Sequence, residues 1–114
     1  MANHKIDRIA SLISRTISDI LANEAKDSLL KTITITGCTV ANDLSFAKVY
    51  FTSLTNLEQK DLEKELKEAA GYIRTKLANK IDLRHTPELK FIYDSSVEYG
   101  NRIEKIIENI HKED

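Results

Sequence analysis

The chain has 114 residues, 17 basic and 18 acidic side chains, and an apolar fraction of 41%. This length predicts a single domain over residues 1–114 with a core that needs no disulfide or metal. Because the total charge is balanced, a charged binding site could arise only where basic or acidic residues cluster locally. The lone Cys38, the lack of a signal-peptide pattern and the lack of an apolar run of about 20 residues predict a soluble, cytoplasmic protein without a membrane segment.

A helix is expected over about residues 4–23, because isoleucines recur there at helical spacing. From Leu30 the period changes to two, and the β-branched run KTITITGCTV predicts a strand. Turn-forming residues follow at 41–45, and FAKVYFTSL alternates again, with Ala47, Val49 and Phe51 on one side. The two strands are therefore expected to form an antiparallel hairpin.

A long helix with an interruption is expected over about residues 56–81. Thr55 and Glu58 have the spacing of a capping box, and an apolar stripe runs from Leu62 to Leu77. Pro87 ends the helical region, and ELKFIYD predicts a third strand. From Ser96 onward, isoleucines at helical spacing predict a terminal helix. A three-stranded sheet with helices on one face would bury these stripes.

The sequence contains no recognisable catalytic or metal-binding pattern. Its three histidines are far apart and form no cluster with Cys38, so we expect no metal and no cofactor. Its three glycines cannot form either phosphate-binding loop pattern, GxGxxG or GxxxxGK. An enzyme is therefore not expected, although a pair of Cys38 with His85 stays open as an alternative.

Charge segregates along the long helix. Residues 58–68 carry five carboxylates against three lysines, whereas residues 72–92 carry five Arg and Lys side chains against two carboxylates. Basic clusters commonly bind phosphate backbones, so the second segment is a candidate nucleic-acid surface. A solvated helix and loop would also account for it.

The order α-β-β-α-α-β resembles a type II KH domain, a nucleic-acid-binding fold whose two consecutive helices are normally joined by a GxxG loop. The glycine positions exclude GxxG here, and Ala69-Ala70-Gly71 stands at that junction. This AxG resembles the bacterial ribosome-binding factor A family, in which it forms a kink between the helices. The segments TITGCTVANDLSFAKVYFTSL and AAGYIRTKLANKIDLRHTPELKFIYDSSVEYGNRI resemble that family too, so the resemblance covers nearly the whole chain.

The resemblance implies an α+β, type II KH-like fold, α-β-β-α-kink-α-β, with an extra C-terminal helix. Within it, Gly71 would sit at the kink, although periodicity alone favours a packing glycine inside one straight helix. The chain departs from the family at Lys26-Asp27-Ser28-Leu29, where many members have Lys-Asp-Pro-Arg, and it lacks the extended tail of some members.

The resemblance also implies a non-catalytic ribosome-binding factor that assists maturation of the 30S subunit through 16S rRNA and is linked to cold adaptation. Its partner would be the free 30S particle, with other assembly factors open, and nothing demands more than a monomer. The candidate RNA-binding residues are Arg74, Lys76, Lys80, Arg84, His85, Lys90, Asn101 and Arg102, with Lys26 and Lys48 as weaker candidates. Each alone could equally be a solvated surface charge, and a protein-interaction module without RNA binding is the alternative function.

Overall fold

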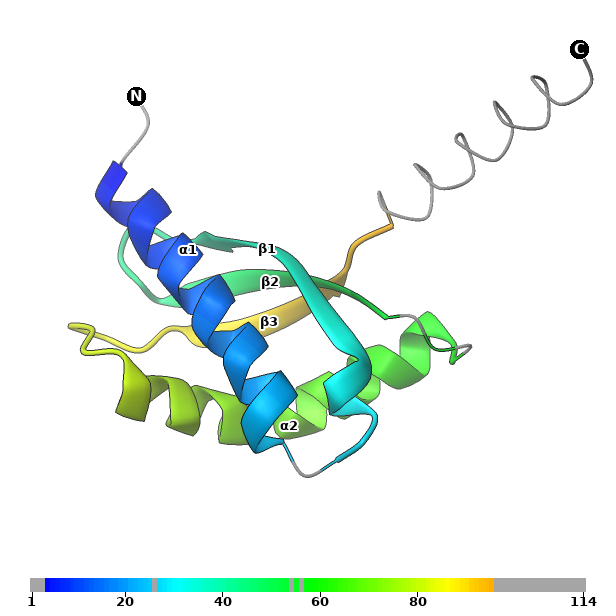
Figure 1. Cartoon of the computed structure of the whole chain (residues 1–114). Helices are drawn as coiled ribbons and strands as arrows, with labels where there is room; N and C mark the ends of the chain where they lie inside the picture. The colour runs from blue at the N-terminus through cyan, green and yellow to red at the C-terminus, as the bar shows by residue number, and fades with distance from the viewer. Residues whose placement is uncertain (1–3, 26, 54, 56, 96–114) are drawn as a thin grey trace, which may run out of the picture.

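The computed structural model of the chain describes residues 4–25, 27–53, 55 and 57–95 (Figure 1). Two α-helices and three strands make up its main elements, joined by short π- and 3₁₀-helical turns. Their bounds are α1 His4–Asp19, the π-turn η1 Ile20–Glu24, the 3₁₀-turn η2 Leu30–Thr32, β1 Ile33–Val40, β2 Phe46–Ser53, α2 Gln59–Lys80 and β3 Glu88–Tyr93. The predicted α+β class and the order of these elements are confirmed.

The sheet has the order β1-β2-β3. β1 and β2 pair antiparallel through the short turn after Val40, whereas β2 and β3 pair parallel because α2 carries the chain back to the starting end of the sheet. Figure 1 shows α1 lying over the β1 side of the sheet and α2 running along the β3 side. Both sheet edges, β1 and β3, are free of a further described strand.

One hydrophobic core joins the two helices to the sheet. Ala47, Val49 and Phe51 are fully buried, as their alternation predicts, and they belong to one cluster with Ile13 and Ile17 of α1 and with Leu66, Ile73 and Leu77 of α2. In β1 the register shifts between Ile35 and Gly37, so the inward side continues with Cys38. This bulge corrects the uniform alternation expected for the strand.

The long helix departs from the expectation. α2 is one continuous α-helix of 22 residues, so no break in helical structure separates two helices at Ala69, Ala70 and Gly71, and the kink expected there stays a prediction. It begins at Gln59, and Glu58 at the N-cap makes no side-chain cap hydrogen bond, so the capping box of Thr55 is wrong. The helix remains intact because buried apolar side chains on both sides of Gly71 anchor it to the core. The expected terminal helix lies outside the described residues.

Candidate nucleic-acid interface

A groove of about 780 Å³ lies between α2 and the free edge of β3. The apolar stripe of α2 faces the core, so the adjacent polar face borders this groove. Pro87 is fully buried just before β3, and the Glu88 amide donates to the Ser45 carbonyl at 3.1 Å. These contacts hold the strand edge against the turn after β1. The groove is lined by Ser45, Glu63, Lys67, Ala70, Gly71, Arg74, His85, Glu88, Leu89, Lys90 and Phe91.

Arg74 connects the helix to the loop that leads into β3. Its Nη2 donates to the Thr86 carbonyl oxygen at 2.7 Å, and its Nε donates to the same oxygen at 3.3 Å. A guanidinium suits this contact because its donors lie in one rigid plane. Arg74 therefore holds the wall of the groove in place and leaves its remaining donors exposed.

The groove carries more positive than negative charge. Lys67, Arg74 and Lys90 line it against two carboxylates, Glu63 and Glu88, and His85 stands in the same lining. Lys67 has no hydrogen-bond or ion-pair partner among residues 57–95 or elsewhere in the described chain. Such an unpaired cation keeps its full charge for an anionic ligand.

The turn beside the groove has a carboxylate of its own. Hydrogen bonds from Ser45 lower the pKa of the Asp43 carboxyl, and the charge of the neighbouring His85 lowers it further. The Ser45 amide donates to Asp43 Oδ1 at 3.0 Å, so this carboxylate accepts a hydrogen bond from within its own turn. Asp43 therefore stays ionised and contributes negative charge at the end of the groove where His85 lies.

Gly71 stands in the same lining. A Cβ built there would meet no atom within 4 Å, and the residue does not have a positive φ. Neither tight packing nor backbone conformation therefore explains the glycine, which corrects the alternative reading of a packing residue. Its effect is to leave a stretch of helix backbone uncovered on the groove surface.

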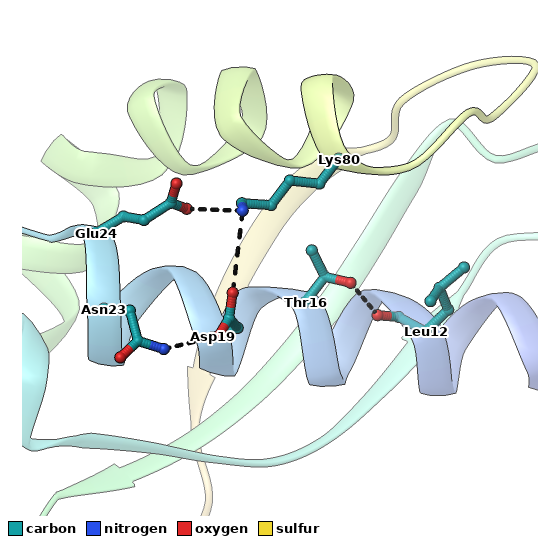
Figure 2. Close-up of polar contacts among 6 residues, drawn as sticks. All are labelled: Leu12, Thr16, Asp19, Asn23, Glu24 and Lys80. Atoms are coloured by element: carbon teal, nitrogen blue, oxygen red, sulfur yellow. Dashed lines mark hydrogen bonds and ion pairs between the residues drawn. The ribbon is translucent and has the colours of Figure 1, made fainter.

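The other predicted residues are scattered. Lys80 lies 3.3 Å from Glu24 Oε2 and 3.9 Å from Asp19 Oδ2, and so bridges α2 to the end of α1 (Figure 2). Lys76 lies 5.6 Å from the centre of the Tyr72 ring, outside the groove lining. Arg84 is exposed in the loop before β3. Asn101 and Arg102 lie outside the described residues.

The structure thus brings together Arg74, His85 and Lys90 and adds Lys67, which sequence reasoning missed. Lys67 precedes Arg74 by seven residues, so the two share one face of a helix. The sequence predicts this shared face if the helix is treated as continuous through Gly71. Glu24, the partner of Lys80, had no comparable signal because the two residues are 56 positions apart in the sequence.

The described residues give no support to the enzyme alternative. Cys38 lines a hollow beside α1, whereas His85 lines the groove beside α2, so the two do not face one site. Burial raises the pKa of the Cys38 thiol to about 11, which disfavours the nucleophilic thiolate. Nowhere in the described ranges do three His, Cys, Asp or Glu side chains gather as metal ligands. Within them, neither helix combines the length and apolarity of a membrane span.

The fold and the groove define a class of protein, a type II KH-like α+β domain with a partly cationic cleft between its second helix and the last strand. Residues 5–107 match the family model described as ribosome-binding factor A. The chain belongs to the ribosome-binding factor A family.

Individual relatives agree over the full length. The ribosome-binding factor A of Staphylococcus carnosus is 44% identical over 115 residues, covering 100% of both chains. That of Staphylococcus saprophyticus is 42% identical, covering 98% of this chain and 99% of its own.

Among solved structures, the crystal structure of ribosome-binding factor A from Thermus thermophilus superposes with a TM-score of 0.69 at 19% identity, covering 77% of this chain and 94% of that one. A Thermus thermophilus ribosome-binding factor A model fitted into the cryo-EM map of a complex with 30S has a TM-score of 0.66 at 19% identity, covering 79% and 96%. These two likenesses support the fold.

Proposed function

We propose that the protein binds the free 30S ribosomal subunit and assists its maturation by holding 16S rRNA in the groove between α2 and β3. Family membership supports the ribosomal partner, and the Thermus thermophilus relative fitted into a 30S complex gives a precedent for it. As a cytoplasmic factor without a catalytic group, it acts through binding energy. It favours one arrangement of the rRNA over another because it binds the two with different affinity.

The observation that carries this proposal is the bare backbone at Gly71 next to the unpaired Lys67. A sugar-phosphate backbone needs both close approach to a surface and cations for its phosphates. Lys90 across the groove, 4.5 Å from the centre of the Phe46 ring, offers a second cation to the same strand of RNA. His85 in the groove lining would contact sugar or further phosphate, and the exposed Arg84, its neighbour in the chain, would add a contact outside the groove.

Several finer points belong to the same proposal. The protein acts as a monomer, with other assembly factors as its additional partners, and its role is linked to cold adaptation, when misfolded rRNA is hardest to resolve. Asn101 and Arg102 extend the RNA surface beyond the described residues. Lys76 contributes long-range charge, whereas Lys80 serves the fold because its ammonium group is already paired.

Charge reversal within the groove tests the proposal. Lys67→Glu with Lys90→Glu is compared with Lys60→Glu and Lys64→Glu, two exposed lysines on the same helix outside the groove. We expect the groove pair to weaken binding to free 30S particles at least about tenfold at physiological salt and the control pair to leave binding nearly unchanged.

Two results would contradict the proposal. Unchanged binding of the groove pair would show that the α2–β3 groove does not hold rRNA. Loss of binding only on reversal of Asp61 and Glu65, in the acidic half of α2, would instead indicate a protein-interaction module. That half lies beside Leu57, which is 46% exposed.

A further inference from the structure

The opposite edge of the sheet has a second hollow, between α1 and β1. Residues of α1 at helical spacing, Asp7, Ser11 and Ser14, line it together with Arg15, and β1 contributes Thr36, Gly37 and Cys38. The hollow continues over the outer side of α1, where Arg8 and Leu12 join the lining. None of these residues was singled out by the charge pattern of the sequence.

The polar side chains that α1 contributes to this hollow have no partner among the described residues, whereas the Thr36 hydroxyl on the β1 side donates to Asp94 Oδ2 at 2.6 Å. The side chains of Arg8, Arg15, Ser11 and Ser14 have no hydrogen-bond or ion-pair partner in the described part of the chain. Thr16 on the same helix shows the contrast, because its hydroxyl donates to the Leu12 carbonyl at 2.7 Å (Figure 2). Two unpaired guanidinium groups seven residues apart lie on one face of the helix, about 10 Å apart along its axis.

The strand side of the hollow is open as well. Gly37 follows the bulge in β1, and a Cβ added to it would meet no atom within 4 Å. Glycine within a strand often marks a place where another backbone approaches closely. The hollow therefore repeats two features of the α2–β3 groove, an unpaired cation in the lining and an uncovered stretch of backbone.

The helix dipole does not account for the cations near the start of α1. Lys5 stands in the first turn, where the dipole favours negative charge and only Asp7 is acidic, and Arg8 follows in the second turn. Asp19, farther along α1, is occupied by Lys80 and Asn23. The Asp7 carboxylate would repel an anion at one end of the hollow. Arg15 and Arg8 are therefore the groups that would bind an anion there.

We propose that the hollow between α1 and β1, with its continuation over the outer side of α1, is a second RNA-backbone site. Arg15 in the hollow and Arg8 in its continuation hold phosphates, and Ser11 and Ser14 hydrogen-bond to phosphate or ribose. The inference rests on the proposed function. Because β1 and β3 are opposite edges of the sheet, the protein would hold two rRNA segments at once, one at each edge. Two linked contacts give a much tighter complex than either alone.

Salt dependence of binding to purified free 30S particles tests the second site with the full chain. We expect Arg8→Glu with Arg15→Glu to weaken binding at least about tenfold and to lower the slope of log affinity against log salt by about 2, one unit per lost phosphate contact. The control pair, Lys60→Glu with Lys64→Glu, should leave the slope near that of the unmodified chain. Both arginines are exposed, so their replacement should not unfold the protein.

The outcomes separate the two proposals. An unchanged slope and affinity for the α1 variant, with loss in the Lys67 and Lys90 variant, would overturn the second site and leave the α2–β3 groove intact. Unchanged binding in both variants would overturn both. A photo-crosslinking amino acid at position 11 identifies the partner directly, and we expect it to label 16S rRNA. Labelling of ribosomal proteins alone, or no labelling, would overturn the second site.

Discussion

At Gly71, a single substitution is expected to change stability and RNA binding in opposite directions. It lies in the interior of α2, at an exposed position with open space around it. We therefore expect Gly71→Ala to raise the free energy of unfolding by about 0.5–1 kcal/mol, because alanine lowers the backbone entropy lost on folding. Urea unfolding measures the change, and a loss of stability would show that the space is not free.

The same substitution should weaken the binding of 30S particles. A methyl group at position 71 would cover the backbone that the proposed rRNA strand approaches. Measuring both stability and 30S binding is informative, because a loss of affinity in a stabilised protein cannot be caused by unfolding. Full affinity in Gly71→Ala would contradict close RNA approach at this point of the groove.

Cys38 gives a prediction about pH. Burial raises the pKa of its thiol from 9.0 to about 11, so the folded state holds its proton more tightly than the unfolded state. Stability from this group is therefore complete below pH 9 and is lost as the pH rises from 9 to 11. Thermal unfolding across this range should show a steeper decline for the unmodified chain than for Cys38→Ala. Equal declines would contradict the raised pKa.

At the scale of elements, the C-terminal end of α2 depends on a contact with the end of α1 and the π-turn after it. Lys80 is the cation beside Glu24 Oε2, an oxygen that accepts no hydrogen bond among the described residues. We expect Lys80→Ala to lower the free energy of unfolding by roughly 0.5–1 kcal/mol, since the pair is partly exposed. A double-mutant cycle with Glu24→Gln checks this, and a coupling energy of zero would show that the pair contributes nothing.

The loop before β3 depends on Arg74. Arg74→Lys keeps the charge but loses the two guanidinium donors that converge on the Thr86 carbonyl oxygen, so segment 84–88 should open more often. Hydrogen exchange of the Glu88 amide, which donates to Ser45, should speed up while exchange in the core of β2 stays unchanged. Unchanged exchange at Glu88 would indicate that Arg74 does not hold the loop.

The sequence predicted the elements well wherever the period of apolar residues was clear. The stripes of α1 and α2 and the alternation of Ala47, Val49 and Phe51 face the core as expected. Local propensity suggested a break at Gly71, but the helix runs through it because tertiary packing overrides that propensity, with Leu66 and Ile73 buried on either side. The bulge in β1 was missed, although a glycine inside a strand, here Gly37, is a common sign of one.

The candidate site was predictable only in part. A charge count along the chain found Arg74, His85 and Lys90, but it could not tell that Lys80 is paired with the π-turn after α1. Such pairing depends on residues distant in sequence that meet only in the fold. For the same reason, Arg15 of α1 became a candidate only when β1 supplied the other wall of its hollow.

At the scale of the whole molecule, the fold offers a hollow with an unpaired cation at each edge of one small sheet, Lys67 in one and Arg15 in the other. A helix covers the core on one side of each hollow, and a glycine leaves backbone uncovered in it. The two helices also share one core, so the two hollows are held at a constant separation. A rigid body of this kind can favour one relative placement of two rRNA segments, which is the action proposed for the protein.

Cosedimentation of the unmodified chain with purified 30S, 50S and 70S particles over a series of salt concentrations tests this account most directly. The account predicts selective binding to free 30S, affinity that falls steeply with salt, and loss of binding when Lys67 and Lys90 are reversed. Absence of binding to every ribosomal particle at low salt, or equal binding to all three, would contradict it.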